Sequence, residues 1–438
     1  MVRVVVVNYE GGDITLRCLD ALLRTDHPTD DLDLVVVDNN SHDGVVDAIR
    51  ARYPRVRVIE SPVNVGFGRG CNLALSDLRG VHHVALVNND AVVEPGWLTP
   101  LLDAIEPEHV GAACPKLLLD VHVRAVVMEA PPDAPLEPGR GVGVTRLMVD
   151  GVDRLSDARF DERFWAPQEV PAEHRDVRWT RRPQASVWWP VEAAAPAQVV
   201  ELGLHAPAPV LVSDGAAPQH AVTMGDDVGL ALSAAHDLRV VNSAGGVLYS
   251  GWFGGDRGYL EVDLGQYDEP AEVFSWCGGA VLLKAEYLRD VGLFDPTFFL
   301  YYEDFDLSWR GRARGWRYVY EPRSVVFHAH GWSSGIGSEA FNDWVDRNRR
   351  LTLVKNGPWA TATRACLGAV STAVRDIAAH VVGALRTRKA PSPSWVVRRT
   401  RRSARVLRAV PHALRERWRI NRGRTVPRSS ALEWMRPR

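Results

Sequence analysis

The chain has 438 residues, of which 46% are hydrophobic and 24% charged, a composition that excludes disorder throughout. Its length is sufficient for two or three domains. The five cysteines are scattered and lack CxxC spacing, which argues against a disulfide framework or a zinc knuckle and favours a reducing compartment. We expect no signal peptide, and no membrane-spanning segment because no run of eighteen apolar residues occurs.

The net charge of −2 hides a difference between the C-terminal tail and the rest of the chain. Residues 361–438 contain 19 Lys and Arg against 3 Asp and Glu, a local charge of +16, so the remainder carries −18. A basic tail predicts a polyanionic partner. That partner is either anionic lipid or nucleic acid, and the charge alone does not distinguish them.

Strand and helix patterns alternate over residues 1–118. The predicted strands are 4–7, 32–37, 56–60 and 84–87, and the predicted helices are 15–24, 44–52 and 70–78. Short apolar strands that alternate with helices are typical of a parallel sheet in an α/β domain. Ligands of such sheets bind beyond the carboxyl ends of the strands. The residues that follow each strand are therefore candidates for a binding site.

Polar clusters follow all four strands. They contain Asn8 after the first strand, Asp38 after the second, Asn64, Gly66, Arg69 and Asn72 after the third, and Asn88, Asn89 and Asp90 after the fourth. A carboxylate at the strand mouth, such as Asp38, can accept hydrogen bonds from a nucleobase or ribose hydroxyl, whereas Ser41 or Asp43 suits the N-cap of the next helix. Glycines let the backbone approach a ligand, and a helix N-terminus beside Arg69 favours a phosphate.

Asp90 is a candidate metal ligand. A diphosphate needs Mg²⁺ or Mn²⁺ to neutralise its charge, and these ions take one or two carboxylates from a protein while water and phosphate complete the shell. The alternative is a simple turn, in which Asn and Asp are common. His328 and His330 end a later predicted strand, where they either pack or supply a further metal ligand.

The character of the sequence changes after residue 118. Residues 119–237 are rich in Pro, Ala and Trp, and short alternating runs predict a β-rich insert to which we assign no function. The α/β pattern returns over 238–356. Residues 357–438 form a C-terminal extension, with an Ala-rich helical pattern at 360–385 and an Arg-rich segment after it.

A second acidic cluster, Glu303, Asp304 and Asp306, follows an aromatic run within the 238–356 segment. A helix predicted over 306–315 makes Asp306 a candidate N-cap. Glu303 and Asp304 precede that helix. An apolar wall raises the proton affinity of a carboxylate, which suits a general base for a sugar hydroxyl.

Seven motifs resemble those of family 2 glycosyltransferases of the GT-A fold, and within them the bacterial rhamnosyltransferase-like and galactofuranosyltransferase-like enzymes. The motifs are "VVVVNYEGG", "VVVDNNSHDG", "NVGFGRGCN", "LVNNDAVVEPGWL", "WCGGAVLLKAEYLRDVGLFDPTFFLYYEDFDLSWRGRARGW", "HAHGWSSG" and "DRNRRLTLVKN". They occupy residues 2–119 and 239–356 in the family's order, which makes the signal specific. The resemblance implies an α/β fold with a Rossmann-like mixed sheet, a β-rich insert and a helical basic tail.

The resemblance also implies roles for the strand-end residues. Asp38 corresponds to the nucleotide-binding Asp. Asn88, Asn89 and Asp90 stand where a DxD motif is expected, with Asp90 as the metal-binding carboxylate and Asn88 in place of the first Asp. The nucleotide-sugar site implied in this way consists of Asn8, Asp38, Asn64, Gly66, Arg69, Asn72, Asn89 and Asp90.

In the second half, Asp304 corresponds to the catalytic base, and Glu303, its neighbour in the "ED" pair, is the second predicted catalytic residue. His328 corresponds to the histidine that adds a contact to the metal or the diphosphate. The residues that resemble the acceptor-side turn are Trp276, Cys277 and Gly278.

The function implied is inverting transfer of a sugar from a nucleoside diphosphate to a glycan or polyprenyl-linked glycan, in synthesis of a cell-envelope polysaccharide. Thymidine-diphosphate rhamnose is the first expectation for the donor, and Mg²⁺ or Mn²⁺ for the cofactor. In the tail, apolar residues and arginines interleave over 395–418, as in helices that lie on anionic membranes. We therefore expect a cytoplasmic protein, peripheral on the inner face of the plasma membrane.

Two other classes of function are weaker. A nucleic-acid-associated protein would use the Arg-rich tail but would leave the strand-end carboxylates idle, so we expect no nucleic-acid partner. A nicotinamide-dependent oxidoreductase on a Rossmann sheet lacks the required GxGxxG after the first strand.

Overall fold

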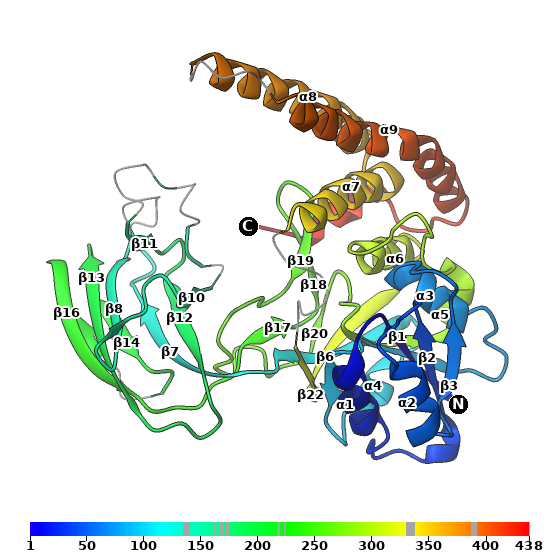
Figure 1. The fold of residues 1–438 in the computed structure, drawn as a ribbon, viewed down its shortest axis with the longest axis horizontal. Coiled ribbons are helices and arrows are strands. Elements are labelled where there is room, and N and C mark those ends of the chain that lie inside the picture. Colours follow the sequence, from blue (N-terminus) through cyan, green and yellow to red (C-terminus); the bar gives the residue numbers. More distant parts are fainter. Residues whose placement is uncertain are drawn as a thin grey trace. The chain divides into compact units, whose positions relative to one another are not determined.

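The computed structural model describes residues 1–134, 141–161, 163–165, 170, 176–216, 220–222, 225–329, 338–386 and 392–437 (Figure 1). The chain forms two compact units. The first comprises Met1–Lys116, Gly245–Arg257 and Pro270–Arg438, and the second comprises Leu117–Ala244 and Gly258–Glu269. The division into four segments that the sequence suggested stays a prediction.

The first unit begins with the predicted parallel sheet. Its strands are β1 (Val2–Asn8), β2 (Leu32–Asp38), β3 (Arg57–Glu60) and β4 (His83–Val87), in the order β4-β1-β2-β3. All pairs are parallel, with Asn8 level with Asp38. Strand β1 is buried along its whole length, which explains its uninterrupted valines. The register brings the polar residues after β1 and β2 to one edge of the sheet.

Further strands make this sheet mixed, which confirms the expected α/β class. Strand β21 (Ala280–Lys284) runs antiparallel to β4, so residues 276–279 approach the end of β4. The remaining strands are β6 (Val110–Leu119), β22 (Arg317–His328), β20 (Ala271–Glu272) and β5 (Ala91–Val93), which pairs with β22. The helices are α1 (Gly12–Leu22), α2 (Val45–Arg52), α3 (Phe67–Ala74), α4 (Leu98–Ile105), α5 (Ala285–Val291) and α6 (Glu303–Arg312).

The second unit is built from β-strands, as the sequence predicted. One sheet has the order β10-β12-β7-β14-β15 and another has the order β11-β8-β13-β16, with β9 beside β8. Side chains of both sheets share one apolar core. The longer strands are β7 (His122–Glu129), β8 (Gly143–Val149), β12 (Gln184–Val191), β13 (Gln198–Ala206), β14 (Val210–Ser213) and β16 (Gly225–Ala234), and the short ones are β9 (Val152–Asp153), β10 (Arg159–Phe160), β11 (Arg178–Trp179), β15 (His220–Val222) and β17 (Val241–Ser243).

The C-terminal residues of the first unit are helical, which confirms the helical tail. Helix α7 (Glu339–Asn356) is followed by α8 (Trp359–Arg386) and α9 (Pro393–Arg422), which lie side by side in Figure 1. The Ser403 hydroxyl on α9 donates to the Ala369 carbonyl on α8 at 2.8 Å, and Arg399 pairs with Asp376. We call this pair of helices the hairpin.

The chain returns from the hairpin to the body of the first unit. After a short helix, Arg428–Trp434, strand β23 (Met435–Arg436) pairs in parallel with β18 (Gly246–Tyr249), whose other neighbour is β19 (Phe253–Asp256). The α9 residue Ala413 packs in one apolar core with Phe305 of α6. The base of the tail is therefore part of the fold.

Helix α8 differs from one expectation. Among the helices described, it is long and apolar enough to cross a membrane by length and composition, although we expected no such segment. Core helices of soluble proteins meet the same criterion. Its outward face nevertheless carries Leu367, Val374 and Leu385, each more than 60% exposed.

Candidate active site

A buried amide joins three strand ends at the edge of the sheet. Asn8 donates from Nδ2 to Asp38 Oδ1 at 2.8 Å and accepts at Oδ1 from Asn89 Nδ2 at 3.1 Å. The Thr15 hydroxyl also donates to Asn8 Oδ1. The structure therefore brings Asn8, Asp38 and Asn89 together, as the sequence predicted.

Asp38 is itself an anchor of this edge. The Ser41 amide donates to Oδ2 at 2.9 Å and the Ser41 hydroxyl to Oδ1 at 2.6 Å. Asp38 is 3% exposed. Its carboxylate thus shapes the loop that follows β2, in addition to the role in nucleotide binding predicted for it.

Asp90 and His328 meet although 238 residues separate them in sequence. Pairing of β5 with β22 sets Ala91 opposite His328, and Asp90 Oδ1 lies 3.0 Å from His328 Nε2. The Asn88 side chain also contacts Nε2, at 3.2 Å. Both Asp90 and His328 are less than 10% exposed. His330 lies outside the described residues.

This donor set fits a divalent cation that is held mainly by its diphosphate ligand. One carboxylate and one imidazole would contribute from the protein, which is the sparse protein shell expected for Mg²⁺ or Mn²⁺ with a nucleotide. Within the described ranges, no cluster of three or more His, Cys, Asp or Glu side chains could enclose a metal by itself. The residues therefore fit a substrate-bridged metal and not a structural one.

Two glycines connect this corner of the sheet to Asp304. The backbone N–H of Asn88 donates to the Gly279 carbonyl at 2.9 Å, and the backbone N–H of Gly278 donates to Asp304 Oδ2 at 2.9 Å. A Cβ on Gly278 would lie 3.4 Å from the same carboxylate oxygen. The segment with the predicted metal ligand, Asn88 to Asp90, and the predicted base Asp304 thus both hydrogen-bond to the Gly278–Gly279 pair.

Glu303 and Asp304 have unusual protonation. Burial, and next the charge of Asp304, raise the pKa of Glu303 to about 8. Burial also raises the pKa of Asp304, and hydrogen bonds from the Gly278 and Phe305 amides offset this only in part. Glu303 is 5% exposed and its Oε2 has no hydrogen-bond partner among the described residues, whereas Asp304 is partly exposed. At neutral pH, Glu303 is therefore mostly neutral and Asp304 is the more accessible acid.

The backbone in front of these acids is strained. Tyr301 and Tyr302 have φ values of 68° and 70°, a left-handed conformation that costs bulky residues free energy. The buried Asn348 side chain holds it, because Nδ2 donates to the carbonyls of Leu300 and Tyr301 at 2.9 and 2.8 Å. Strain of this kind is typical of positions where a fold aims a functional side chain.

Two expectations about this helix are wrong. Glu303 and Asp304 do not precede α6 but are its first two residues, and Asp306 is not the N-cap, which is Tyr302. Asp306 is instead fully buried, with Oδ2 2.7 Å from Lys355 Nζ and 3.0 Å from Arg310 Nε. Because α6 begins at Glu303, Asp306 lies inside the helix, where its carboxylate pairs with the buried Lys355.

No role was predicted from the sequence for the residues around Asp306. Lys355 Nζ also contacts Asp295 Oδ2 at 2.6 Å, and Asn356 Nδ2 donates to Asp306 Oδ1 at 2.9 Å. His412 of α9 lies 3.2 Å from Asp295. The signal that could have revealed them is the apolar setting of "LTLVKN", where a lysine requires a buried carboxylate partner.

The glycine-rich loop divides into two parts. Asn64 Oδ1 accepts from the Gly66 amide, and Gly66 has a φ of +84° with the Phe299 carbonyl where a Cβ would stand, so only glycine fits. Arg69 is exposed. The Asn72 amide is used within the fold, because it donates to the Phe294 carbonyl at 2.9 Å and accepts from the Phe294 amide at 3.1 Å.

The residues predicted for the acceptor side belong to the segment before β21, which contacts Asp304 through Gly278. Trp276 is 1% exposed and packs edge-on against Phe294. Burial, followed by the charges of Asp256 and Asp304, raises the pKa of the Cys277 thiol, so the side chain is an inert neighbour of the acids. Gly278 supplies the amide described above.

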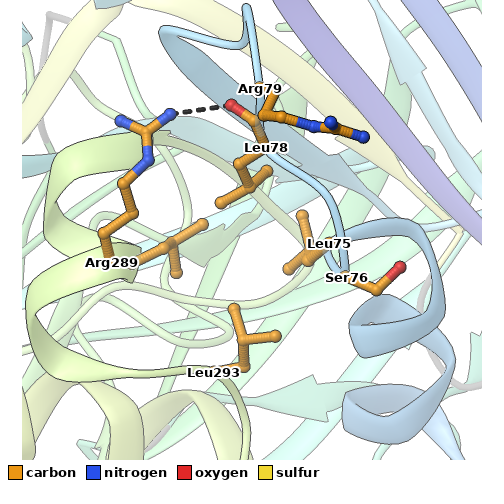
Figure 2. A pocket seen from close by; sticks show the side chains of 7 residues that line it. Leu75, Ser76, Leu78, Arg79, Arg289 and Leu293 are labelled. Atoms are coloured by element: carbon orange, nitrogen blue, oxygen red, sulfur yellow. Dashed lines mark hydrogen bonds between the residues drawn. The ribbon is translucent and has the colours of Figure 1, made fainter.

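A separate cavity of about 290 Å³ lies between the end of α3 and α5 (Figure 2). It is lined by leucines together with Ser76, Arg79 and Arg289, and Arg289 donates to the Leu78 carbonyl at 2.7 Å. It contains none of the predicted site residues. We assign it no role in binding.

Comparison with known proteins identifies the N-terminal part of the first unit. Residues 3–122 match the family model described as glycosyl transferase family 2. The chain contains a family 2 glycosyltransferase domain. This confirms the predicted family and argues against the oxidoreductase alternative. The second half of the predicted motif set lies outside the matched residues.

One curated relative of the family 2 domain is the N-acetylglucosaminyl-diphospho-decaprenol L-rhamnosyltransferase of Mycobacterium tuberculosis. It is 32% identical over 112 residues, which cover 23% of this chain and 36% of the relative. The chain therefore spans about a third of the length of that relative.

Two solved structures are similar over more of the chain. One is GalNAc-T7 with UDP, GalNAc and Mn²⁺, with 12% identity, a TM-score of 0.44, and coverage of 81% of this chain and 48% of that chain. The other is the mannosyltransferase PcManGT from Pyrobaculum calidifontis with GDP-Man and Mn²⁺, with 14% identity, a TM-score of 0.37, and coverage of 99% and 78%.

Proposed function

We propose that the protein is an inverting glycosyltransferase that moves a sugar from a nucleoside diphosphate to a hydroxyl of a glycan or polyprenyl-linked glycan. The observation that carries the proposal is the Gly278–Gly279 turn, which hydrogen-bonds to Asn88 on one side and to Asp304 on the other. A ligand that reaches both residues would have its diphosphate beside Asp90 and its anomeric carbon near the acid. The family 2 domain supports this reaction class.

In this mechanism, Asp304 accepts the proton of the acceptor hydroxyl as the oxygen attacks the anomeric carbon, and the nucleoside diphosphate leaves from the opposite face. Neutral Glu303 keeps a second negative charge away from the reaction. Asp90 and His328 would hold Mg²⁺ or Mn²⁺, which neutralises charge on the leaving diphosphate when it is bound. Asn8, Asp38 and Asn89 shape the nucleotide side of the site.

Thymidine-diphosphate rhamnose is the proposed donor. Its support is the relative that is named as an L-rhamnosyltransferase and aligns with this chain over 112 residues. Thermal shift of the full chain with a panel of sugar nucleotides, with and without Mn²⁺, tests this proposal. A shift with another sugar nucleotide and none with thymidine-diphosphate rhamnose would overturn the choice of donor but leave the reaction class intact.

The metal role makes a direct prediction. Asp90→Ala removes the carboxylate from the proposed cation site, so we expect weaker donor binding and no further increase when Mn²⁺ is added. Isothermal titration of the donor at several Mn²⁺ concentrations measures both quantities. Asp103→Ala, which removes an exposed carboxylate of α4 outside the proposed site, is the matched control. A metal response that is unchanged in Asp90→Ala would contradict the assignment.

We further propose that the hairpin rests on an anionic membrane surface at the inner face of the plasma membrane. Its α8 face carries a stripe of exposed apolar side chains at helical spacing, and α9 carries exposed arginines. An interfacial helix combines these two features. The stripe consists of Leu367, Val370, Val374, Val382 and Leu385.

Point variants test the membrane proposal better than truncation, because α9 contributes Ala413 to the core of the first unit. We expect Val374→Glu with Leu385→Glu to abolish flotation with vesicles that contain phosphatidylglycerol. Val152→Glu, which alters an exposed valine of the second unit, is the control. Undiminished flotation of the double variant would exclude the stripe as the contact.

A further inference from the structure

Three arginines at the base of the hairpin have no acidic partner. They are Arg417 of α9, and Arg424 and Arg428 in the segment that follows α9. Within the described part of the chain, none of the three forms an ion pair with a carboxylate, although Arg417 is only 2% exposed. Buried guanidinium groups without a counter-charge are costly, so each requires an explanation.

Two of these arginines are explained in part by the end of α7. Arg417 Nη1 donates to the carbonyls of Val354 and Gly357, each at 2.8 Å. Arg428 Nη1 donates to the Lys355 carbonyl at 3.0 Å. The last turn of a helix carries partial negative charge and unpaired carbonyls, which a cation stabilises.

Arg424 is not explained in this way. Its Nη1 donates to the Val426 carbonyl at 3.0 Å, two residues away. Its Nε and Nη2 are buried and have no hydrogen-bond partner among the described residues, and the same holds for Nε and Nη2 of Arg417. A buried donor without a partner costs about 1–3 kcal/mol. The Arg417 guanidinium lies over the Trp359 ring, 3.9 Å from its centroid, so the two unpartnered donors of Arg424 are the ones that indicate a missing acceptor.

A cavity lies beside Arg424. It has a volume of about 200 Å³, room for several water molecules at about 30 Å³ each. Arg312, Arg424 and Arg428 line it, but Arg312 is paired with Glu272 at 2.6 Å. The one carboxylate in its lining is the exposed Glu433. The remaining wall is mostly apolar and includes four aromatic residues, Phe274, Trp309, Trp316 and Trp434.

These arginines also disfavour the charged form of their neighbours. Burial, then the charges of Arg424 and Arg417, lower the pKa of Arg428 to about 9. Burial, then the charge of Arg424, lower the pKa of Arg417 to about 10. Burial lowers the pKa of Arg424. An anion between them would reverse this effect, since an opposite charge favours the charged form.

We propose that this cavity is an anion site for a phosphate group, with Arg424 as its ligand and with Arg428, whose Nη2 already donates to Asn421 Oδ1 at 2.7 Å, adding its positive charge beside the site. Guanidinium groups bind phosphate through paired, charge-assisted hydrogen bonds, and a phosphate oxygen is the acceptor that the orphan donors of Arg424 lack. The site is separate from the proposed donor site and does not depend on the proposed reaction.

The phosphate can come from a lipid headgroup or from a soluble phosphate compound. The first test uses inorganic phosphate as the probe on the full chain in EDTA, so that no metal supports binding at the donor site. We expect phosphate to raise the unfolding temperature of the wild type, and Arg424→Gln to weaken phosphate binding roughly tenfold or more. Arg422→Gln, at an exposed arginine two residues away, should bind as the wild type does.

Arg424→Gln also separates a ligand site from a structural role. If Arg424 serves an absent anion, the variant without phosphate should be at least as stable as the wild type, because a buried unpaired charge is removed. An unfolding temperature that falls equally with and without phosphate would overturn the proposal. So would the absence of any phosphate response in the wild type, or an equal response in Arg424→Gln.

The source is then decided with vesicles of phosphatidylcholine, with and without phosphatidate. A lipid headgroup at the site predicts weaker binding of Arg424→Gln to phosphatidate vesicles, and competition by inorganic phosphate. A soluble ligand predicts equal vesicle binding by Arg424→Gln and the wild type, together with lost phosphate binding. Because the hairpin stripe is unchanged in this variant, failure here leaves the membrane proposal standing.

Discussion

Four carboxylates lie at or near the start of α6, and they divide into two pairs with opposite surroundings. Asp295 and Asp306 surround the buried Lys355, at 2.6 and 2.7 Å. Glu303 and Asp304 have no ion pair with a cation among the described residues, and receive only backbone hydrogen bonds. Asp304 and Asp306 are two residues apart on one helix. The comparison shows that the partner, and not the position in sequence, decides what each acid does.

The pKa values of Asp295 and Glu303 follow from these surroundings. Burial alone would raise the pKa of Asp295, but the charge and hydrogen bond of Lys355, with hydrogen bonds from Thr297, lower it well below its usual range. Burial with no cation raises the pKa of Glu303 to about 8. Asp295 is therefore held as an anion, and its ion pair with Lys355 stabilises the fold. The pair of Glu303 and Asp304 can exchange protons, which catalysis requires.

The largest expected effect is on catalysis. Asp304→Asn removes the proposed base but keeps the size of the side chain, so we expect activity to fall about 10²–10⁴-fold. Donor binding and the unfolding temperature should change little. Steady-state turnover, isothermal titration of the donor and thermal unfolding measure the three quantities. Wild-type turnover in this variant would remove Asp304 from the mechanism.

Removing the cation shared by Asp295 and Asp306 should instead lower the stability of the fold. Lys355→Met leaves Asp295 and Asp306 buried without their shared cation, which costs about 3–5 kcal/mol of unfolding free energy. Urea unfolding measures this loss. Adding Asp306→Asn to Lys355→Met removes one of the two buried carboxylates that lost their cation. The double variant should therefore recover part of the stability. If Lys355→Met were as stable as the wild type, the network would be no more than a chance contact.

Much of the candidate active site was predictable from the sequence. The β-branched runs located β1, β2 and β4, and the strand-end rule then located Asn8, Asp38 and Asp90 at one edge. This works because buried parallel strands are short, apolar and end where ligands bind. The resemblance to family 2 added Asp304.

The surroundings of Asp295 and Asp306 were not predictable by the same means. The cation that fixes Asp306 comes from Lys355, 49 residues later, and local capping statistics pointed to the wrong role for Asp306. Likewise, the count of tail arginines did not distinguish the exposed Arg419 from the buried Arg417. Local patterns report which elements form, whereas ion-pair partners depend on packing between elements that lie far apart in sequence.

A smaller effect tests the neutral state of Glu303. Its pKa in the fold, about 8, exceeds its ordinary value of 4.5, so the folded state binds more protons between these values. The stability contributed by the protonated form is present below about pH 4.5 and is lost as the pH rises towards about 8. Glu303→Gln mimics the neutral form, and we expect it to gain on the order of 1–3 kcal/mol at pH 8 with a flatter pH dependence.

Activity provides the control for that experiment. If Glu303 is neutral during catalysis, Glu303→Gln keeps most of the turnover that Asp304→Asn loses. Urea unfolding from pH 5 to pH 8, with turnover measured alongside, separates the two acids. A loss of activity as large as that of Asp304→Asn would mean that the proton of Glu303 takes part in the reaction.

The smallest effect concerns the link between the paired acids and the hairpin. His412 of α9 lies 3.2 Å from Asp295, but its side chain is 32% exposed, so water screens the interaction. We expect His412→Gln to cost about 0.5–1 kcal/mol in urea unfolding and to leave turnover unchanged. Gln retains a hydrogen-bond donor. A loss as large as that of Lys355→Met would mean that α9, and not α7, supplies the cation on which Asp295 depends, so that movement of the hairpin would act on the start of α6 directly.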